Sequence, residues 1–200
     1  MYKFAVLPYL NAALLVHILQ DVCSNAELIY HPPRETFSEL TTDRVDAAIV
    51  PVVDYLETPG FDIVDDLGIS ADGNVESVLL QCKCPLNKVK MINLDPASKT
   101  SNLLVELLLK KHFSVRQNIH FCYGSAKADA CVMIGDRALS TERSLESYDL
   151  AAEWKRMTGL PFVFAVWACR ADHTDKERLF EILHTTKKTG LKAIDRLSKL

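Results

Sequence analysis

The sequence lacks an excess of basic charge. Its 200 residues include 23 Lys and Arg against 26 Asp and Glu, which gives a formal net charge of −3. Nucleic-acid-binding domains usually carry a basic patch or a high pI, so no nucleic-acid partner is expected. An anionic ligand must therefore be held by local hydrogen-bond donors rather than by the overall charge.

Long apolar runs are also missing. No apolar segment approaches the length that spans a bilayer, so no membrane partner is expected. The apolar stretch that follows Met1 contains Pro8, Asn11 and His17. It has no small-residue cleavage site, and this pattern predicts a strand, a turn and a helix rather than a signal peptide.

The motifs of several enzyme and metal-site classes do not occur. The sequence has no Gly-x-Ser-x-Gly elbow, no Walker loop and no dinucleotide fingerprint. The six histidines are scattered without metal-ligand spacing, and Cys82 and Cys84 have no second pair to complete a zinc site. We therefore expect no metal or other cofactor, and reduced thiols rather than disulfides.

What the sequence does have is an alternation of apolar and amphipathic segments, which is typical of an α/β fold. Hydrophobic residues make up 48% and charged residues 24%, an ordinary balance for a globular enzyme. The expected strands are residues 2–7, 26–30, 46–50, 63–67, 77–81, 90–94, 119–122 and 130–134. Helices between consecutive strands predict right-handed crossovers in a parallel sheet.

Two longer segments give more detailed predictions. Residues 149–167 begin as an amphipathic helix, stop at Gly159 and continue as a wholly apolar run, which predicts a strand buried on both faces of a parallel sheet. Residues 100–113 predict a helix with one apolar face. That face is expected to consist of Leu103, Leu104, Leu107 and Leu108.

The two α/β halves follow one another without a flexible linker, which predicts two lobes joined by crossing strands. We expect the crossings near residues 80–85 and 161–165. One lobe would then hold residues 1–80 and 166–200, and the other residues 81–165. Bilobal folds of this kind bind a ligand in the cleft between the lobes and close over it.

Asn11 is the first candidate for a site residue. It follows the first expected strand, at the carboxyl end where open α/β sheets bind their ligands, and its amide could donate to a carboxylate or hydroxyl. The alternative is that Asn11 caps a helix that starts at Ala12.

A second candidate is the group of hydroxyls at Ser98, Thr100 and Ser101, between a strand and a long helix. Hydroxyls and free backbone N–H groups at a helix N-terminus form a cradle for a carboxylate, and the helix dipole favours negative charge there. Capping of the helix is the alternative, although three hydroxyls exceed what one cap needs.

Gly135, Asp136 and Ser77 complete the candidates. Gly135 permits close backbone approach to a ligand, and Asp136 follows an apolar strand as a general acid or base, or as the cap of the next turn. Ser77 is a hydroxyl donor, or an ordinary serine of a strand.

Six segments together resemble the menaquinone-pathway chorismate dehydratases, in the order in which that family has them. The segments are VLPYLNA at 6–12, DAAIVPV at 46–52, GNVESVLL at 73–80, LDPASKTS at 94–101, IGDRAL at 134–139 and DLAAEWKRMTGLPFVFAVW at 149–167. Members of that family usually carry further C-terminal helices beyond the point that corresponds to Leu200. Ala13 and Leu14 also stand where a proline often follows the asparagine.

The resemblance implies an α/β, two-lobed periplasmic-binding-protein-like (type II) fold with an interlobe cleft, working in the cytoplasm. It implies a hydro-lyase that converts chorismate, a dianion, to 3-[(1-carboxyvinyl)oxy]benzoate and water without a cofactor, and it leaves a homodimer open. The alternatives are the sister family, which makes 1,4-dihydroxy-6-naphthoate, and a non-catalytic binding protein. The expected roles are catalysis by Asn11 and Ser77, and substrate binding by Tyr9, Ser98, Thr100, Ser101, Gly135 and Asp136.

The chemistry of chorismate suits such neutral donors. Loss of a ring proton and of the hydroxyl makes the ring aromatic, so the protein needs chiefly to orient the substrate and neutralise its charge. Because the candidates include neither a histidine nor a lysine base, we expect the enolpyruvyl carboxylate of the substrate itself to take the proton.

Overall fold

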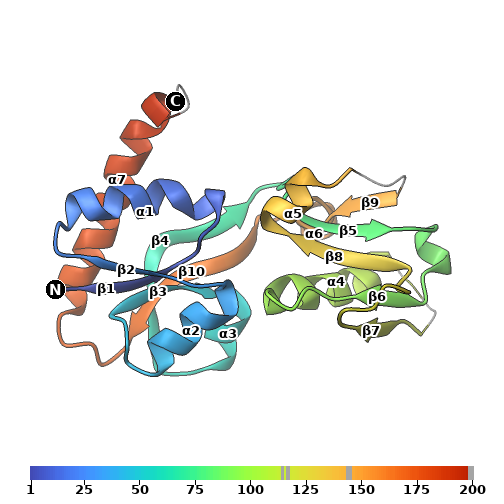
Figure 1. The fold of residues 1–200 in the computed structure, drawn as a ribbon, viewed down its shortest axis with the longest axis horizontal. Coiled ribbons are helices and arrows are strands. Elements are labelled where there is room, and N and C mark those ends of the chain that lie inside the picture. Colours follow the sequence, from blue (N-terminus) through green and yellow to red (C-terminus); the bar gives the residue numbers. More distant parts are fainter. Residues whose placement is uncertain (114, 116–117, 143–145, 198–200) are drawn as a thin grey trace. The chain divides into compact units, whose positions relative to one another are not determined.

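The computed structural model describes residues 1–113, 115, 118–142 and 146–197, with the backbone alone at residues 10, 11, 14 and 194–197 (Figure 1). The chain divides into two compact units. Unit 1 contains Met1–Ile69 and Ala165–Leu200, and unit 2 contains Ser70–Phe164. Within the described residues, each unit contains a sheet of five strands.

Unit 1 begins with the predicted alternation of parallel strands and helices. The first strand, β1 (Lys3–Val6), pairs in parallel with β2 (Glu27–Tyr30) on one side and β3 (Ala47–Pro51) on the other. The connections are α1 (Leu10–Val22) and α2 (Pro33–Thr41). The predicted βαβαβ arrangement is therefore confirmed for this part of the chain.

The sheet of unit 1 is mixed rather than parallel throughout. Its order is β2-β1-β3-β10-β4, with β4 at Phe61–Ala71 and β10 at Phe162–Arg170. β10 pairs antiparallel with β3, with Val166 opposite Val50. The prediction of a parallel strand after Gly159 was thus wrong in direction, because an apolar pattern reports burial and not strand polarity.

The apolar run of β10 is also not buried along its whole length. Val163 is 39% exposed, whereas its neighbours Phe162 and Phe164 pack against the core of unit 2. Further along the strand, Trp167 and Cys169 are buried in the core of unit 1. One strand therefore supplies apolar side chains to the cores of both units, which explains why its sequence shows no polar alternation.

Helices cover both faces of the central strands of unit 1 (Figure 1). Phe4 packs edge-on against Trp167, with ring centroids 6.0 Å apart, on the face that α1 and α7 (Lys176–Leu197) cover. Ala5 and Ala48 belong to the opposite cluster, beneath α2 and α3 (Val52–Glu57). Burial on both faces is the reason that β3 contains only apolar residues.

Unit 2 has the sheet order β7-β6-β8-β5-β9. β6 (Met91–Asn93) pairs in parallel with β7 (His120–Cys122) and β8 (Ala130–Ile134). β5 pairs antiparallel with β8 and with β9, a strand that we did not predict from the sequence. The bounds of these two are β5 Val78–Cys82 and β9 Glu146–Asp149.

The boundary expected after residue 80 is corrected by this pairing. It falls inside β5, all of which pairs with strands of unit 2, and the structure instead changes unit between Ile69 and Ser70. The second boundary lies between Phe164 and Ala165. The helices of unit 2 are a short 3₁₀ turn at Leu86–Lys88, α4 (Lys99–Lys111), α5 (Gly135–Ser140) and α6 (Leu150–Thr158).

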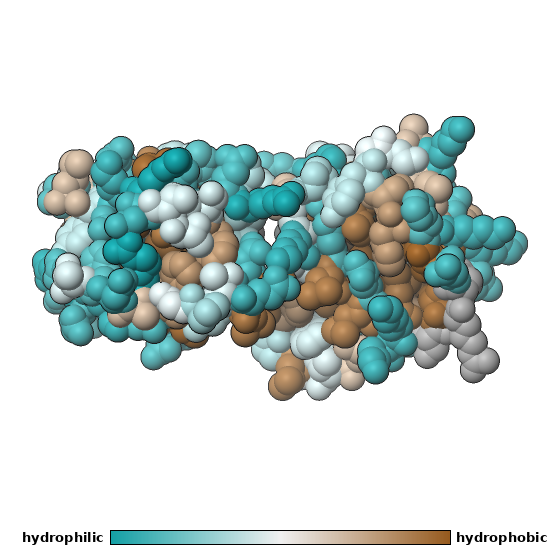
Figure 2. Space-filling model, turned by 90° about the horizontal axis from the view of Figure 1, so that it is seen from below, coloured by the Kyte–Doolittle hydropathy of each residue, from teal (hydrophilic) through white to brown (hydrophobic). Residues whose placement is uncertain are grey.

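The buried face of α4 differs from the predicted one. Leu104 and Leu108 are buried as expected, but Leu103 is 49% exposed and Leu107 is 37% exposed. Val105 and Leu109 take their places in the core. The buried face is therefore shifted by one residue toward the C-terminus relative to the predicted one. Figure 2 shows apolar side chains at the surface of unit 2, on the right of that view.

The helix predicted before Gly159 is confirmed. α6 ends at Thr158, and Gly159 adopts a left-handed conformation with φ of 76° while its N–H donates to the carbonyl of Lys155 at 2.8 Å. Glycine takes this conformation without steric cost, which is why it ends helices so often. The chain then turns into β10.

Gly68 in β4 offers a test of the packing between β4 and β10. A Cβ at this position would lie 2.6 Å from the carbonyl oxygen of Ala165, too close for backbone atoms. Gly68→Ala should therefore lower the free energy of unfolding by about 1–3 kcal/mol, measured by urea denaturation. Ser70→Ala, at an exposed position of the same strand, is the control and should change it by less than about 0.5 kcal/mol. Equal effects of the two substitutions would contradict the packing described.

Candidate functional site

The strand directions of unit 2 bring three predicted segments to one edge of its sheet. β6 and β8 are parallel, so their carboxyl ends lie at the same edge, and β5 starts there because it runs antiparallel to β8. The N–H of Gly135, after β8, donates to the carbonyl of Ser77, before β5, at 2.8 Å. The structure therefore joins two predicted site residues that lie far apart in the sequence.

The turn between β6 and α4 is held by reciprocal bonds between Asp95 and Asn102. The N–H of Asp95 donates to Oδ1 of Asn102 at 3.0 Å, and Nδ2 of Asn102 donates to the carbonyl of Asp95 at 2.8 Å. The carboxylate of Asp95 also accepts the N–H of Ala97 at 2.9 Å. These bonds fix the backbone of the turn that leads to the hydroxyls at the start of α4.

Ser98 is the N-cap of α4, so the capping alternative is correct for this residue. Its Oγ accepts the N–H of Ser101 at 3.1 Å and donates to Oγ of Ser101 at 2.8 Å. The hydrogen of the Ser101 hydroxyl remains available to another acceptor, because Ser101 only accepts in this pair. The cap thus uses the Ser98 hydroxyl both as acceptor and as donor, and it uses the Ser101 hydroxyl only as acceptor.

Thr100 supplies the hydroxyl that capping does not explain. The residue is 3% exposed, and its Oγ1 has no hydrogen-bond partner among the residues that the structure describes. Burying a hydroxyl without a partner is unfavourable, and such groups are rare in native proteins. Together with the dipole of α4, this hydroxyl makes the turn a candidate binding site for an anion.

Arg137 is a site residue that the sequence reasoning missed. It lies in α5, and its guanidinium donates to Oδ2 of Asp95 at 2.5 Å. The side chain of Asp95 is 5% exposed and that of Arg137 is 60% exposed, so the positive charge is anchored to the turn but faces solvent. Its position directly after Asp136, in a segment already singled out, was the available signal.

Asp136 lies next to Arg137 in the first turn of α5 and is exposed. Because Ile134 is the N-cap of α5, without a side-chain bond, Asp136 does not act as the cap that the sequence left open. Ser77 is half-buried at the start of β5. The structure therefore brings Ser77, Gly135 and Asp136 to the same edge as the turn of Ser98–Ser101.

Tyr9 and Asn11 belong to unit 1. Tyr9 is the N-cap residue of α1, which begins at Leu10, so Asn11 lies inside the first turn. The alternative that Asn11 caps a helix starting at Ala12 was therefore wrong, because the helix starts two residues earlier. The side chain of Asn11 lies outside the described part of the structure, and its place in one cleft with Thr100 stays a prediction.

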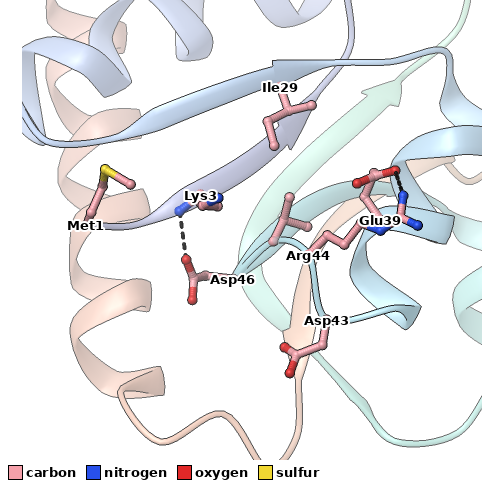
Figure 3. A pocket seen from close by; sticks show the side chains of 8 residues that line it. Met1, Lys3, Ile29, Glu39, Asp43, Arg44 and Asp46 are labelled. Atoms are coloured by element: carbon pink, nitrogen blue, oxygen red, sulfur yellow. Dashed lines mark hydrogen bonds and ion pairs between the residues drawn. The ribbon is translucent and has the colours of Figure 1, made fainter.

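A cavity of about 530 Å³ in unit 1 is not at these positions (Figure 3). It lies where β1 and β3 begin, whereas Tyr9 and Asn11 follow the end of β1. Its polar groups already have partners within the protein. Asp46 accepts the N–H of Lys3 at 2.7 Å, and Glu39 pairs with Arg44 at 3.2 Å. The ammonium of Lys3 pairs with Glu27, and Asp43 pairs with Arg170. The cavity is lined by Met1, Lys3, Ile29, Glu39, Asp43, Arg44, Val45 and Asp46.

Two thiols on neighbouring strands of unit 2, at the end of the β5–β8 pair opposite Ser77, are poor nucleophiles. Burial raises the pKa of Cys82 to about 12 and also raises the pKa of Cys131, so both stay protonated at neutral pH. All six cysteines are free. In the described parts of the chain, no three His, Cys, Asp or Glu side chains could hold a metal ion, and no helix is long and apolar enough to cross a membrane.

A family model described as menaquinone biosynthesis matches residues 2–200. The chain belongs to this menaquinone biosynthesis family. The chorismate dehydratase of Campylobacter jejuni is 33% identical over 172 residues, which cover 84% of this chain and 64% of that protein. The chorismate dehydratase of Thermus thermophilus is 27% identical over 214 residues, covering 95% of this chain and 78% of that protein. The chain thus spans less than two thirds of the length of the Campylobacter relative.

Solved structures show the fold of this family member. Protein AF1704 from Archaeoglobus fulgidus has a TM-score of 0.73 at 12% identity, over 98% of this chain and 78% of that one. A Candida albicans gene product with the generic periplasmic-binding-protein fold has a TM-score of 0.61 at 11% identity, over 98% and 73% of the two chains. The predicted α/β, periplasmic-binding-protein-like fold is therefore confirmed.

Two substitutions at the N-terminus of α4 should differ in their effect on stability. Thr100→Val removes a buried hydroxyl that lacks a partner, and it should leave the free energy of unfolding unchanged or raise it by about 1 kcal/mol. Ser98→Ala removes the cap of α4 and should lower it by about 1 kcal/mol. Urea denaturation measures both. A loss of stability in Thr100→Val as large as in Ser98→Ala would show that the Thr100 hydroxyl has a partner within the protein.

Proposed function

We propose that this protein is a chorismate dehydratase, which converts chorismate to 3-[(1-carboxyvinyl)oxy]benzoate and water. Membership of the menaquinone biosynthesis family and the names of the two relatives support this proposal. The observation that carries it is the buried hydroxyl of Thr100 at the N-terminus of α4, which has no hydrogen-bond partner among the described residues. The guanidinium of Arg137 is bound to Asp95 in the turn that precedes the same helix. These groups suit a carboxylate, and chorismate carries two.

The turn before α4 binds one substrate carboxylate in this proposal. The hydroxyls of Thr100 and Ser101 donate to it, and the dipole of α4 stabilises its negative charge. Arg137 adds a positive charge near the same edge while Asp95 holds it in place. Ser98 acts indirectly, because its Oγ is already engaged in the cap and orients Ser101.

The reaction is a loss of water that makes the ring aromatic. A ring C–H bond breaks, its electron pair forms a new ring double bond, and the C–O bond to the hydroxyl breaks. The enolpyruvyl carboxylate of the substrate takes the ring proton and passes it to the departing hydroxyl, which leaves as water. The protein then contributes orientation and hydrogen-bond donors rather than a base.

Ser77 and Asn11 are the proposed catalytic donors. Ser77 stands at the same sheet edge as the anion-binding turn, and its backbone is fixed by the bond from Gly135. Asn11 and Tyr9 come from the segment that follows β1 in unit 1. Gly135 and Asp136 complete the binding residues at the end of β8, where Asp136 orients the substrate hydroxyl without abstracting the ring proton.

The purified protein should produce an aromatic benzoate from chorismate, detected by its ultraviolet spectrum and its mass. Binding of chorismate without a product would favour a non-catalytic binding protein on the same fold. Activity on cyclic dehypoxanthine futalosine, with none on chorismate, would favour the sister enzyme that makes 1,4-dihydroxy-6-naphthoate. A heat-denatured sample controls for the spontaneous breakdown of chorismate.

Substitution of the donors should separate catalysis from binding. Ser77→Ala and Asn11→Ala should each lower kcat by about 10²–10³, the usual cost of losing one preorganised donor. Asp136→Asn should cost less, because in this proposal it orients the substrate only. The pH profile of kcat should show no limb near the pKa of histidine. Loss of all turnover in Asp136→Asn, with chorismate still bound, would make Asp136 the acid–base residue instead.

A further inference from the structure

We propose that Asp149 is a positioning residue, which sets the conformation of the turn that carries Ser77. This inference rests on the proposed function, because it gives Ser77 a role in turnover. Asp149 is the last residue of β9 and the N-cap of α6. Nothing in the sequence pattern beyond its place before an amphipathic helix distinguishes it from an ordinary cap.

The carboxylate of Asp149 does more than cap α6. Its Oδ1 accepts the backbone N–H groups of Ala151 and Ala152, both at 3.1 Å, which is a complete N-cap. Its Oδ2 accepts the backbone N–H groups of Val75 at 2.9 Å and Glu76 at 2.7 Å. One side chain therefore fastens the turn before β5 to the start of α6.

The turn needs such a partner because its backbone is strained. Glu76 has a φ of 60°, in the left-handed region that residues with a side chain avoid. The next N–H, that of Ser77, donates to the carbonyl of Val75 at 2.7 Å. The two N–H groups that this tight turn directs outward are the ones that Asp149 accepts.

Ser77 is thus held from both sides. Asp149 fixes the two residues before it, and Gly135 donates to its carbonyl at 2.8 Å. With the backbone fixed on both sides, only the rotamer of the Ser77 hydroxyl is free. Displacement of a reacting or donating group by about 1 Å costs about 10² in rate, so fastening this turn matters directly for turnover.

A carboxylate suits this position better than an amide or a hydroxyl. It has two oxygens, both acceptors, and four N–H groups point at them. An asparagine would place its NH₂ group against N–H donors, either those of Val75 and Glu76 or those of Ala151 and Ala152. Serine caps a helix well but is too short to reach the turn as well. Asp149→Ser therefore keeps the cap of α6 and removes the bonds to Val75 and Glu76.

The test compares Asp149→Ser with Thr158→Ala at the other end of α6. Thr158 accepts the N–H of Leu160 at 3.1 Å and donates to the carbonyl of Trp154 at 2.9 Å, so its substitution loosens the same helix without touching the turn. Asp149→Ser should lower kcat for chorismate about 10–100-fold with a smaller change in KM. Thr158→Ala should leave kcat within about twofold. Equal kcat values in the two variants would overturn the proposal.

The same substitution in a Ser77→Ala background distinguishes positioning from a general loss of structure. If Asp149 acts through Ser77, then Asp149→Ser should lower kcat no further once the hydroxyl is gone, because coupled residues are not additive. An equal fold-loss of kcat in both backgrounds would show that Asp149 acts independently of Ser77 and would overturn the proposal.

Hydrogen exchange gives a readout that needs no turnover. The amides of Val75 and Glu76 should exchange at least about tenfold faster in Asp149→Ser, whereas those of Leu79 and Leu80 in β5 should not change. Unchanged exchange at Val75 and Glu76 would overturn the proposal even in an active enzyme. If the wild-type protein converts no chorismate while Asp149→Ser still shows this faster exchange, the proposed function is refuted and the fastening of the turn by Asp149 stands.

Discussion

The antiparallel pairing of β5 with β8 is the constraint on which the rest of the candidate site depends. It places the start of β5 at the same edge as the ends of β6 and β8, so Ser77 and Gly135 meet there. Had β5 run parallel to β8, Ser77 would lie at the opposite edge of the sheet. β5 is the first strand of unit 2 after the chain leaves β4, so no strand of unit 2 precedes it in the sequence.

The polar groups at this edge divide between structural and unassigned roles. Asp95, Asn102 and Ser98 are occupied by bonds that hold the turn and cap α4. Thr100 is buried but has no such bond within the described residues. A hydroxyl kept without a partner costs stability, and a ligand that accepts its hydrogen would remove that cost on binding. The turn therefore combines a fixed backbone with one hydroxyl donor that a bound anion could satisfy.

Much of the secondary structure could be predicted because it follows from local patterns. The alternation of apolar and amphipathic segments located α1, β3, α6 and the end of α6 at Gly159. The buried face of α4 was predicted only in part, because its five leucines fit two adjacent helical faces. Packing in the core selected Leu104, Leu108 and Leu109 and left Leu103 and Leu107 exposed. Strand β9 was missed because its polar residues carry no apolar period.

The sequence by itself determined the family, the α/β fold and the residues to consider, since these depend on short segments and their order along the chain. Tertiary structure alone decided strand direction, the unit to which β5 belongs, and the partners of the polar side chains. Arg137 meets Asp95, and Asp149 meets Val75 and Glu76, only because strands distant in sequence pair at one edge. Hydrogen bonds join groups that are close in space, and a linear pattern does not contain that proximity.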